Sequence, residues 1–158
     1  MPQASSSGSD VGGRELVVTR VFNAPRTLVF ETWAKAEHVA RWFGPLPYFI
    51  KVVSMDFRPG GRYRFMMCGP DGKDLHPFGG EYREIVAPER IVMTDAFEEP
   101  GSPVMLWTVT FAESAGKTAL KVHVLFESPE VRDQYLKMGM REGLTQCVDQ
   151  IDDVLRSL

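Results

Sequence analysis

The three histidines are the first residues to consider for acid–base chemistry, because an imidazole titrates near neutral pH. His38, His76 and His123 fall on three different predicted elements, so their spacing pairs none of them. His123 alternates with Val122 and Val124 in a strand pattern, which predicts that it faces away from the apolar side. His76 lies at the start of a predicted strand and is the better catalytic candidate.

Carboxylates within predicted strands are the second source of acid–base chemistry, because burial among apolar walls raises the pKa of a carboxyl group. We select Glu81 beside His76 as a candidate catalytic residue, although the sequence shows no carboxylate to be buried. The sequence contains no nucleophile elbow, phosphate-binding loop, dinucleotide fingerprint or His-Glu-x-x-His motif, so a function other than catalysis is favoured. The strand carboxylates are Asp56, Glu81, Glu84 and Asp95.

The two cysteines predict neither a disulfide nor a metal site. Cys68 and Cys147 are far apart and lack the spacing of metal ligands. We therefore expect two free thiols in a reducing cytoplasm, with no metal ion and no cofactor.

Two arginines after the turn Pro59-Gly60-Gly61 raise the question of anion binding. Arg62 and Arg64 share one strand face, opposite Tyr63 and Phe65. An outward face makes the arginines solvated or paired with glutamates of the next strand, and this interpretation is favoured. An inward face places them to bind a carboxylate or phenolate.

The elements that position these side chains follow from changes in hydrophobic period. Residues 14–22 alternate and are rich in β-branched side chains, which predicts a strand. Residues 23–36 and about 37–43 switch to helical spacing, and Gly44-Pro45 ends the second helix. We therefore predict one strand followed by two short helices.

The remainder of the chain predicts a sheet and a long helix. Six strand patterns between Tyr48 and Glu127 are separated by turn residues, as in an antiparallel meander. Ser128 is a good N-cap for a helix whose apolar residues recur to the C-terminus. The order predicts a single α+β domain over residues 14–158, after a flexible Ser/Gly-rich tail over residues 1–13.

Three features favour a cavity between sheet and helix. Gly139 and Gly143 lie one turn apart in the predicted long helix, so either the sheet approaches closely or space is left for a ligand. Tyr82 and Thr94 offer hydroxyls among apolar walls, a mixture typical of small-molecule sites. The strands also carry large apolar side chains, for which a packed core is the favoured interpretation from the residues alone. These are Tyr63, Phe65, Met67, Met93, Phe97, Trp107, Val109 and Phe111.

Several sequence strings resemble one known family. From about Arg14 to Leu158 the chain is similar to homologues of the activator of the heat-shock-protein-90 ATPase, in the START-like, birch-pollen-allergen-like group called SRPBCC. The strings are "RVFNAPRTLVFETW", "HVARWFGP", "MDFRPGGRYRF", "GGEYREIVAPERIVMTDAF" and "MREGLTQCVDQIDDVL". The resemblance implies a helix-grip fold, in which a seven-stranded curved antiparallel sheet surrounds a long C-terminal helix. It also implies two short helices after the first strand and an internal hydrophobic cavity.

The implied cavity turns the aromatic and methionine side chains into candidate ligand contacts. Trp42 and Phe43 end the second short helix, where a helix-grip fold has its cavity mouth. We expect one of the two to pack inward and the other to border the entrance. The candidate contacts are Trp33, Trp42, Phe43, Tyr63, Phe65, Met67, Tyr82, Met93, Trp107, Met140, Gly143 and Cys147.

Our leading functional hypothesis is the binding or carriage of a small hydrophobic molecule, aromatic or lipid-like, in this cavity. One alternative is a cyclase, dehydratase or hydrolase that uses the same cavity. A second is a co-chaperone-like domain that stimulates a chaperone ATPase, as the family resemblance suggests. Exposed aromatics near Trp42 also allow a homodimer.

Composition excludes several other classes of function. The net charge of −3 argues against nucleic-acid binding, which usually requires a basic face. No apolar run approaches the roughly 18 residues of a membrane helix. The N-terminus has neither the basic region nor the apolar region of a secretory signal, so we expect a cytoplasmic protein.

Overall fold

The computed structural model describes residues 13–158. The prediction of a flexible tail over residues 1–13 falls on residues that, apart from Gly13, lie outside the described ones. The strands are β2 (Glu15–Phe22), β3 (Phe49–Met55), β4 (Arg62–Cys68), β5 (Asp74–Val86), β6 (Arg90–Phe97), β7 (Met105–Ser114) and β8 (Lys117–Leu125).

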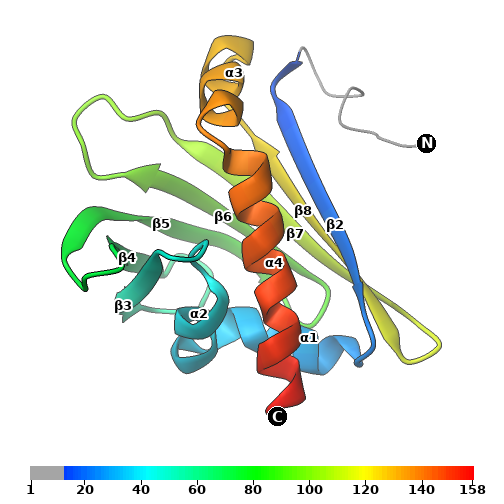
Figure 1. Cartoon of the computed structure of the whole chain (residues 1–158). Coiled ribbons are helices and arrows are strands. Elements are labelled where there is room, and N and C mark those ends of the chain that lie inside the picture. Colours follow the sequence, from blue (N-terminus) through cyan, green and yellow to red (C-terminus); the bar gives the residue numbers. More distant parts are fainter. Residues whose placement is uncertain (1–12) are drawn as a thin grey trace.

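The strands form one seven-stranded antiparallel sheet with the order β2-β8-β7-β6-β5-β4-β3. Every neighbour in the sheet is also a neighbour in sequence, except that the first strand β2 pairs with the last strand β8. The sheet curves around the C-terminal helix, with the two short helices at one end (Figure 1). The predicted α+β helix-grip arrangement is confirmed.

The two short helices follow β2 as predicted. They are α1 (Arg26–Ala34) and α2 (Ala36–Trp42). Pro25 is the N-cap of α1, and its extended backbone suits the residue that precedes a helix. Lys35 is extended as well and separates the two helices. Because this break is a single residue, α1 and α2 remain packed against each other at the end of the sheet.

The predicted long helix is divided into α3 (Pro129–Lys137) and α4 (Met140–Arg156), so its prediction as one continuous element was wrong. Ser128 caps α3 as predicted, because its Oγ accepts a hydrogen bond from the backbone N–H of Val131 at 3.1 Å. The break occurs at Gly139, whose φ of +92° is left-handed. A residue with a side chain rarely adopts this conformation, and glycine adopts it freely.

Helix α4 packs its apolar face against the concave side of the sheet. On β7 the residues at alternate positions are buried, which is the period of a strand with one face toward a core. Within residues 13–158, none of the helices combines the length and apolar character that crossing a membrane requires. The buried residues of α4 are Leu144, Cys147, Val148, Ile151 and Val154.

Two consecutive glycines in β5 permit close approach of the neighbouring strands. A Cβ atom on Gly79 would lie 2.2 Å from the carbonyl oxygen of Tyr63 on β4. A Cβ atom on Gly80 would lie 2.0 Å from the carbonyl oxygen of Thr94 on β6. Gly80 is the register partner of Tyr63, so β5 has no side chain where Tyr63 crosses it.

Candidate functional site

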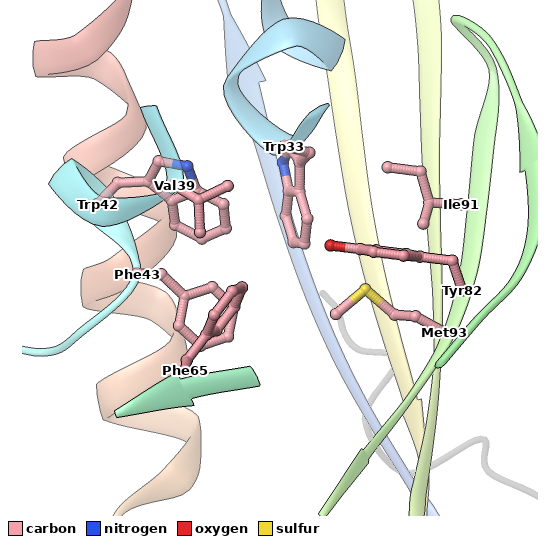
Figure 2. Close-up of a pocket in the computed structure, with 8 residues that line it drawn as sticks. All are labelled: Trp33, Val39, Trp42, Phe43, Phe65, Tyr82, Ile91 and Met93. Carbon is pink, nitrogen blue, oxygen red and sulfur yellow. The ribbon is translucent and has the colours of Figure 1, made fainter. Parts of the chain in front are cut away.

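An aromatic pocket lies between the short helices and the concave face of the sheet (Figure 2). Helices α1 and α2 and the residue after α2 form one side, and β4, β5 and β6 form the other. The cavity volume is about 10 Å³, close to the minimum that holds one water molecule. Side chains therefore fill nearly all of the enclosed space. The lining residues are Trp33, Val39, Trp42, Phe43, Phe65, Tyr82, Ile91 and Met93.

Two tryptophans form the helical wall of the pocket. Trp42 is only 1% exposed, and its Nε1–H donates a hydrogen bond to the carbonyl of Thr32 at 2.8 Å. Its ring centroid lies 4.6 Å from that of Trp33. The buried Nε1–H groups of Trp33 and Trp107 have no acceptor among the described residues. An unpaired buried donor costs about 1–3 kcal/mol, so a ligand acceptor at either indole is stabilising.

Phe43 fills the space in front of the sheet. Its ring centroid lies 5.5 Å from Phe65, 5.9 Å from Phe78 and 6.0 Å from Trp107. These three rings come from β4, β5 and β7, so the Phe43 ring lies across β6. Phe43 is only partly buried, whereas its neighbour Trp42 is inside the core. Of the two tandem aromatics, Phe43 therefore leaves the interior at the lower cost in free energy.

Helix α4 holds the segment that carries Phe43. The Sγ of Cys147 accepts a hydrogen bond from the backbone N–H of Gly44 at 3.3 Å. The Nε2 of Gln150 donates to the carbonyl oxygens of Trp42 at 2.8 Å and Gly44 at 3.0 Å. Burial raises the pKa of Cys147 to about 11, so this side chain is a neutral thiol at physiological pH. Three hydrogen bonds thus fix the backbone on both sides of Phe43.

A polar pair lies directly behind the pocket wall. The hydroxyl of Tyr63 is 2.8 Å from Oδ1 of Asp95 and 2.6 Å from the carbonyl oxygen of Thr94. Tyr63 also contacts two pocket residues, with ring centroids 4.8 Å from Phe65 and 5.2 Å from Tyr82. Burial raises the pKa of Asp95 to about 7, and the Tyr63 hydrogen bond opposes this rise. Asp95 is therefore a carboxyl group that exchanges a proton near neutral pH.

Comparison with known proteins identifies the family. The family described as "Activator of Hsp90 ATPase homolog 1-like protein" matches residues 23–156. The chain belongs to this family. Its SRPBCC-like fold is known for ligand binding in a cavity, and family members generally bind small hydrophobic ligands and sometimes chaperones. No curated protein matches the chain.

Solved structures of similar proteins share this fold. A protein from Arthrobacter aurescens, solved by solution NMR, is 26% identical with a TM-score of 0.86, over 94% of this chain and 90% of that chain. A crystal structure from Mycobacterium smegmatis is 31% identical with a TM-score of 0.83, over 94% of each chain. A protein of the dynemicin biosynthetic locus is 20% identical with a TM-score of 0.71, over 90% of this chain and 47% of that chain. At 20% identity the last comparison shows the fold alone.

Half of the predicted ligand contacts lie at the aromatic pocket of this family member. Trp33, Trp42, Phe43, Phe65, Tyr82 and Met93 line it. Figure 2 shows Tyr82 beside Met93, with its hydroxyl directed toward Trp33. Tyr63 and Trp107 are buried in the adjoining layer, Met67 and Met140 are partly buried at the edge of the core, and Cys147 bonds Gly44. Their role in ligand binding stays a prediction.

The two C-terminal glycines do not form the predicted stripe along one helix. Gly139 lies between α3 and α4, and its left-handed backbone explains the residue type. Gly143 lies within α4, and a Cβ atom there would be 3.6 Å from Cγ of Pro45, an ordinary contact. Neither glycine therefore provides the argument for ligand space that we drew from the sequence.

The two predicted catalytic candidates lie at the protein surface. The side chain of His76 is 52% exposed, with Nδ1 3.7 Å from Glu99. Glu81 is partly exposed, with Oε1 3.7 Å from Nε of Arg83. The structure brings neither to the aromatic pocket. Sequence reasoning instead passed over Asp95, whose position two residues after Met93 in β6 was the available signal, because alternate strand residues share a face.

The strand arginines face outward, as favoured from the sequence. The Nε and Nη2 of Arg64 contact the two carboxylate oxygens of Glu98 at 2.6 and 3.0 Å. Arg62 is exposed on the same face. Within residues 13–158, no three His, Cys, Asp or Glu side chains are grouped to hold a metal ion.

Proposed function

We propose that the protein binds a small, mainly apolar molecule in the aromatic pocket between α1, α2 and the sheet. The observation that carries this proposal is the insertion of the half-buried Phe43 ring among aromatic side chains of β4, β5 and β7. A ring in that place is exchangeable for a ligand of similar chemistry. The unpaired indole N–H groups of Trp33 and Trp107 offer hydrogen bonds to such a ligand.

Ligand entry requires Phe43 to move, because a cavity of about 10 Å³ admits no organic molecule. The movement breaks the contacts of one partly buried ring and strains the hydrogen bonds from Cys147 and Gln150. The following segment offers little resistance, since Leu46, Tyr48 and Phe49 are exposed.

Phe43→Ala is therefore expected to bind a neutral hydrophobic probe, N-phenyl-1-naphthylamine, about ten-fold more tightly than the wild type. Burial of an aromatic side chain contributes about 1.5–3 kcal/mol, and a half-buried ring contributes about half of that, of which the upper end corresponds to this factor. Probe fluorescence reports binding directly. The emission of Trp33, Trp42 and Trp107 gives a second readout, because the three indoles surround the site.

Phe49→Ala is the matched control, because it removes the same ring from an exposed position on β3. Its affinity for the probe is expected to equal that of the wild type. If neither the wild type nor Phe43→Ala binds the probe saturably, the proposed function is wrong. Native mass spectrometry of the purified protein, followed by denaturing extraction, then identifies any natural ligand.

Catalysis on the bound molecule is the second candidate function, and Asp95 is the observation that favours it. A buried carboxyl with a pKa of about 7 is suited to proton transfer at neutral pH. Conversion of the extracted compound by the protein, and the loss of that conversion in Asp95→Asn, distinguishes an enzyme from a carrier. Unaltered compound after incubation supports carriage.

Self-association and location are further proposals. Trp42 is buried, so a homodimer through aromatics near it has to use Tyr48 and Phe49, each 40% exposed. Light scattering of the purified chain tests this proposal, and a strict monomer would contradict it.

Binding to a chaperone is a proposal that is supported only by membership of the family. Cys68 and Cys147 are both unpaired, which supports the predicted cytoplasmic location.

A further inference from the structure

Asp95 is a carboxylic acid within the aromatic interior. It is 7% exposed and lies on β6, two residues after the pocket residue Met93. Its register partner is Met105 on β7, and Met93 is paired with Trp107. Asp95 and Trp107 are therefore diagonal neighbours on the concave face, about 7–8 Å apart in backbone position.

Gly80 creates the route by which Tyr63 reaches Asp95. Tyr63 is on β4 and Asp95 is on β6, so the phenol side chain has to cross β5 between them. The crossing point is Gly80, the register partner of Tyr63, which has no side chain to block it. The pair is thus built by three adjacent strands, and its hydrogen bond of 2.8 Å is buried.

The Tyr63 hydroxyl is the donor within this pair. It has one proton, and a backbone carbonyl such as that of Thr94 only accepts. The hydroxyl donates to the carbonyl oxygen of Thr94 at 2.6 Å and to Oδ1 of Asp95 at 2.8 Å, so the two oxygens share one proton. Tyr63 therefore occupies Oδ1 of Asp95 and leaves the second carboxyl oxygen for another donor.

The remaining polar groups determine which hydrogen-bond donors and acceptors a ligand needs. The second oxygen of Asp95 accepts no hydrogen bond from the described residues, so it can accept one from a ligand. The buried Nε1–H of Trp107 lacks an acceptor, so it can donate one. A hydroxyl group is able to pair with both kinds of group, because it donates one hydrogen bond and accepts others. An ammonium group cannot accept from the indole, and a carbonyl group cannot donate to Asp95.

We propose that Asp95, supported by Tyr63, and Trp107 form the polar end of the ligand site, and that the ligand is an apolar molecule with a neutral hydroxyl group, an alcohol or a phenol. This inference rests on the proposed function, because it assigns the polar groups in the layer that adjoins the lining of the same pocket. The ring of Phe43 stacks near Trp107 and lies across β6, the strand that carries Asp95. Its departure opens the space in front of Trp107, the diagonal neighbour of Asp95.

The test compares phenol with toluene, two probes of nearly the same shape that differ in a hydroxyl and a methyl group. Both are titrated into the wild type and Phe43→Ala, and NMR follows the backbone and indole N–H signals. The ratio of phenol affinity to toluene affinity is expected to fall about ten-fold in Asp95→Leu, the factor that about one lost hydrogen bond produces. Trp107→Phe keeps an aromatic ring without the N–H and is expected to lower the ratio about five-fold.

Two further variants make the result specific. Asp95→Asn keeps a carbonyl oxygen and is expected to retain most of the preference for phenol. Thr118→Val is the control, because it removes a buried hydroxyl that bonds the carbonyl of Ala24 on another part of the sheet. Its affinity ratio is expected to equal that of the wild type. If Asp95→Leu fails to fold, the Trp107→Phe ratio decides the inference.

Three results overturn the proposal in different ways. Saturable binding of both probes with a ratio unchanged in Asp95→Leu and Trp107→Phe removes the polar site and leaves the pocket proposal standing. If benzylamine binds more tightly than phenol and this preference is lost in Asp95→Leu, the site recognises a cation and not a neutral hydroxyl group. Binding of no probe, including N-phenyl-1-naphthylamine, refutes the proposed function and this inference together.

Discussion

The wild type is expected to lose about 4 kcal/mol of unfolding free energy relative to Asp95→Asn as the pH rises from 4 to 8. Burial raises the pKa of Asp95 from the ordinary 3.8 to about 7 in the folded protein. A pKa change of this size corresponds to about 4 kcal/mol. Between the two pKa values the folded state binds more protons than the unfolded state, so stability falls with rising pH in that window. Asn carries no titratable proton, and the difference between the proteins isolates this effect.

Urea unfolding at a series of pH values measures both proteins. The titratable groups that interact electrostatically with Asp95 are Tyr63 on β4 and Tyr135 on α3. Burial raises the pKa of each above its ordinary value of 10. Neither therefore changes charge between pH 4 and pH 8. Asp74→Asn is a control in which the pH dependence has the opposite sign. The Lys51 ammonium lowers the pKa of Asp74, so this carboxylate stabilises the folded protein more as the pH rises. Parallel stability curves for the wild type and Asp95→Asn are inconsistent with a raised pKa at Asp95.

Gly80→Ala is expected to lower the free energy of unfolding by about 3 kcal/mol, the upper part of the usual range for overpacking. The new Cβ atom would lie 2.0 Å from the carbonyl oxygen of Thr94 and 2.6 Å from both its carbonyl carbon and its Oγ1. Thr94 cannot move aside freely, because its Oγ1 accepts a hydrogen bond from the backbone N–H of Glu81. Its carbonyl also accepts from Tyr63. Chemical denaturation measures the loss.

Gly143→Ala is the matched control for this substitution. It adds the same methyl group within α4, where the nearest atom outside the helix is Cγ of Pro45 at 3.6 Å. Alanine favours a helix over glycine by about 1 kcal/mol, so this variant is expected to be slightly more stable than the wild type. Equal stability of Gly80→Ala and Gly143→Ala contradicts the close approach of β5 and β6.

Local patterns were sufficient to predict most elements of the fold. Alternating β-branched residues, turn glycines and prolines, and the Ser128 cap are properties of short segments, and the corresponding elements lie where they were predicted. The family resemblance added the arrangement of the sheet around the helix. The break at Gly139 was missed because a left-handed φ is not visible in helical periodicity, which continues across the residue.

The choice among the strand carboxylates depended on tertiary structure. Glu81 and Asp95 both lie in alternating strand patterns, and we selected Glu81 from the sequence. In the structure Glu81 is partly exposed and Asp95 is buried on the concave face of β6. Alternation within β6 puts Asp95 on the same face as Met93, and only the packing of the sheet decides that this face is the concave one.

The chain by itself therefore determined the α+β order of elements and an aromatic interior, because each element depends on residues within a few positions of one another. The tertiary structure alone decided that Phe43 fills the pocket and that Trp42 is held inside. It also decided that Gly80 opens a route from Tyr63 to Asp95. These features join residues far apart in sequence, and their distances depend on how strands and helices pack.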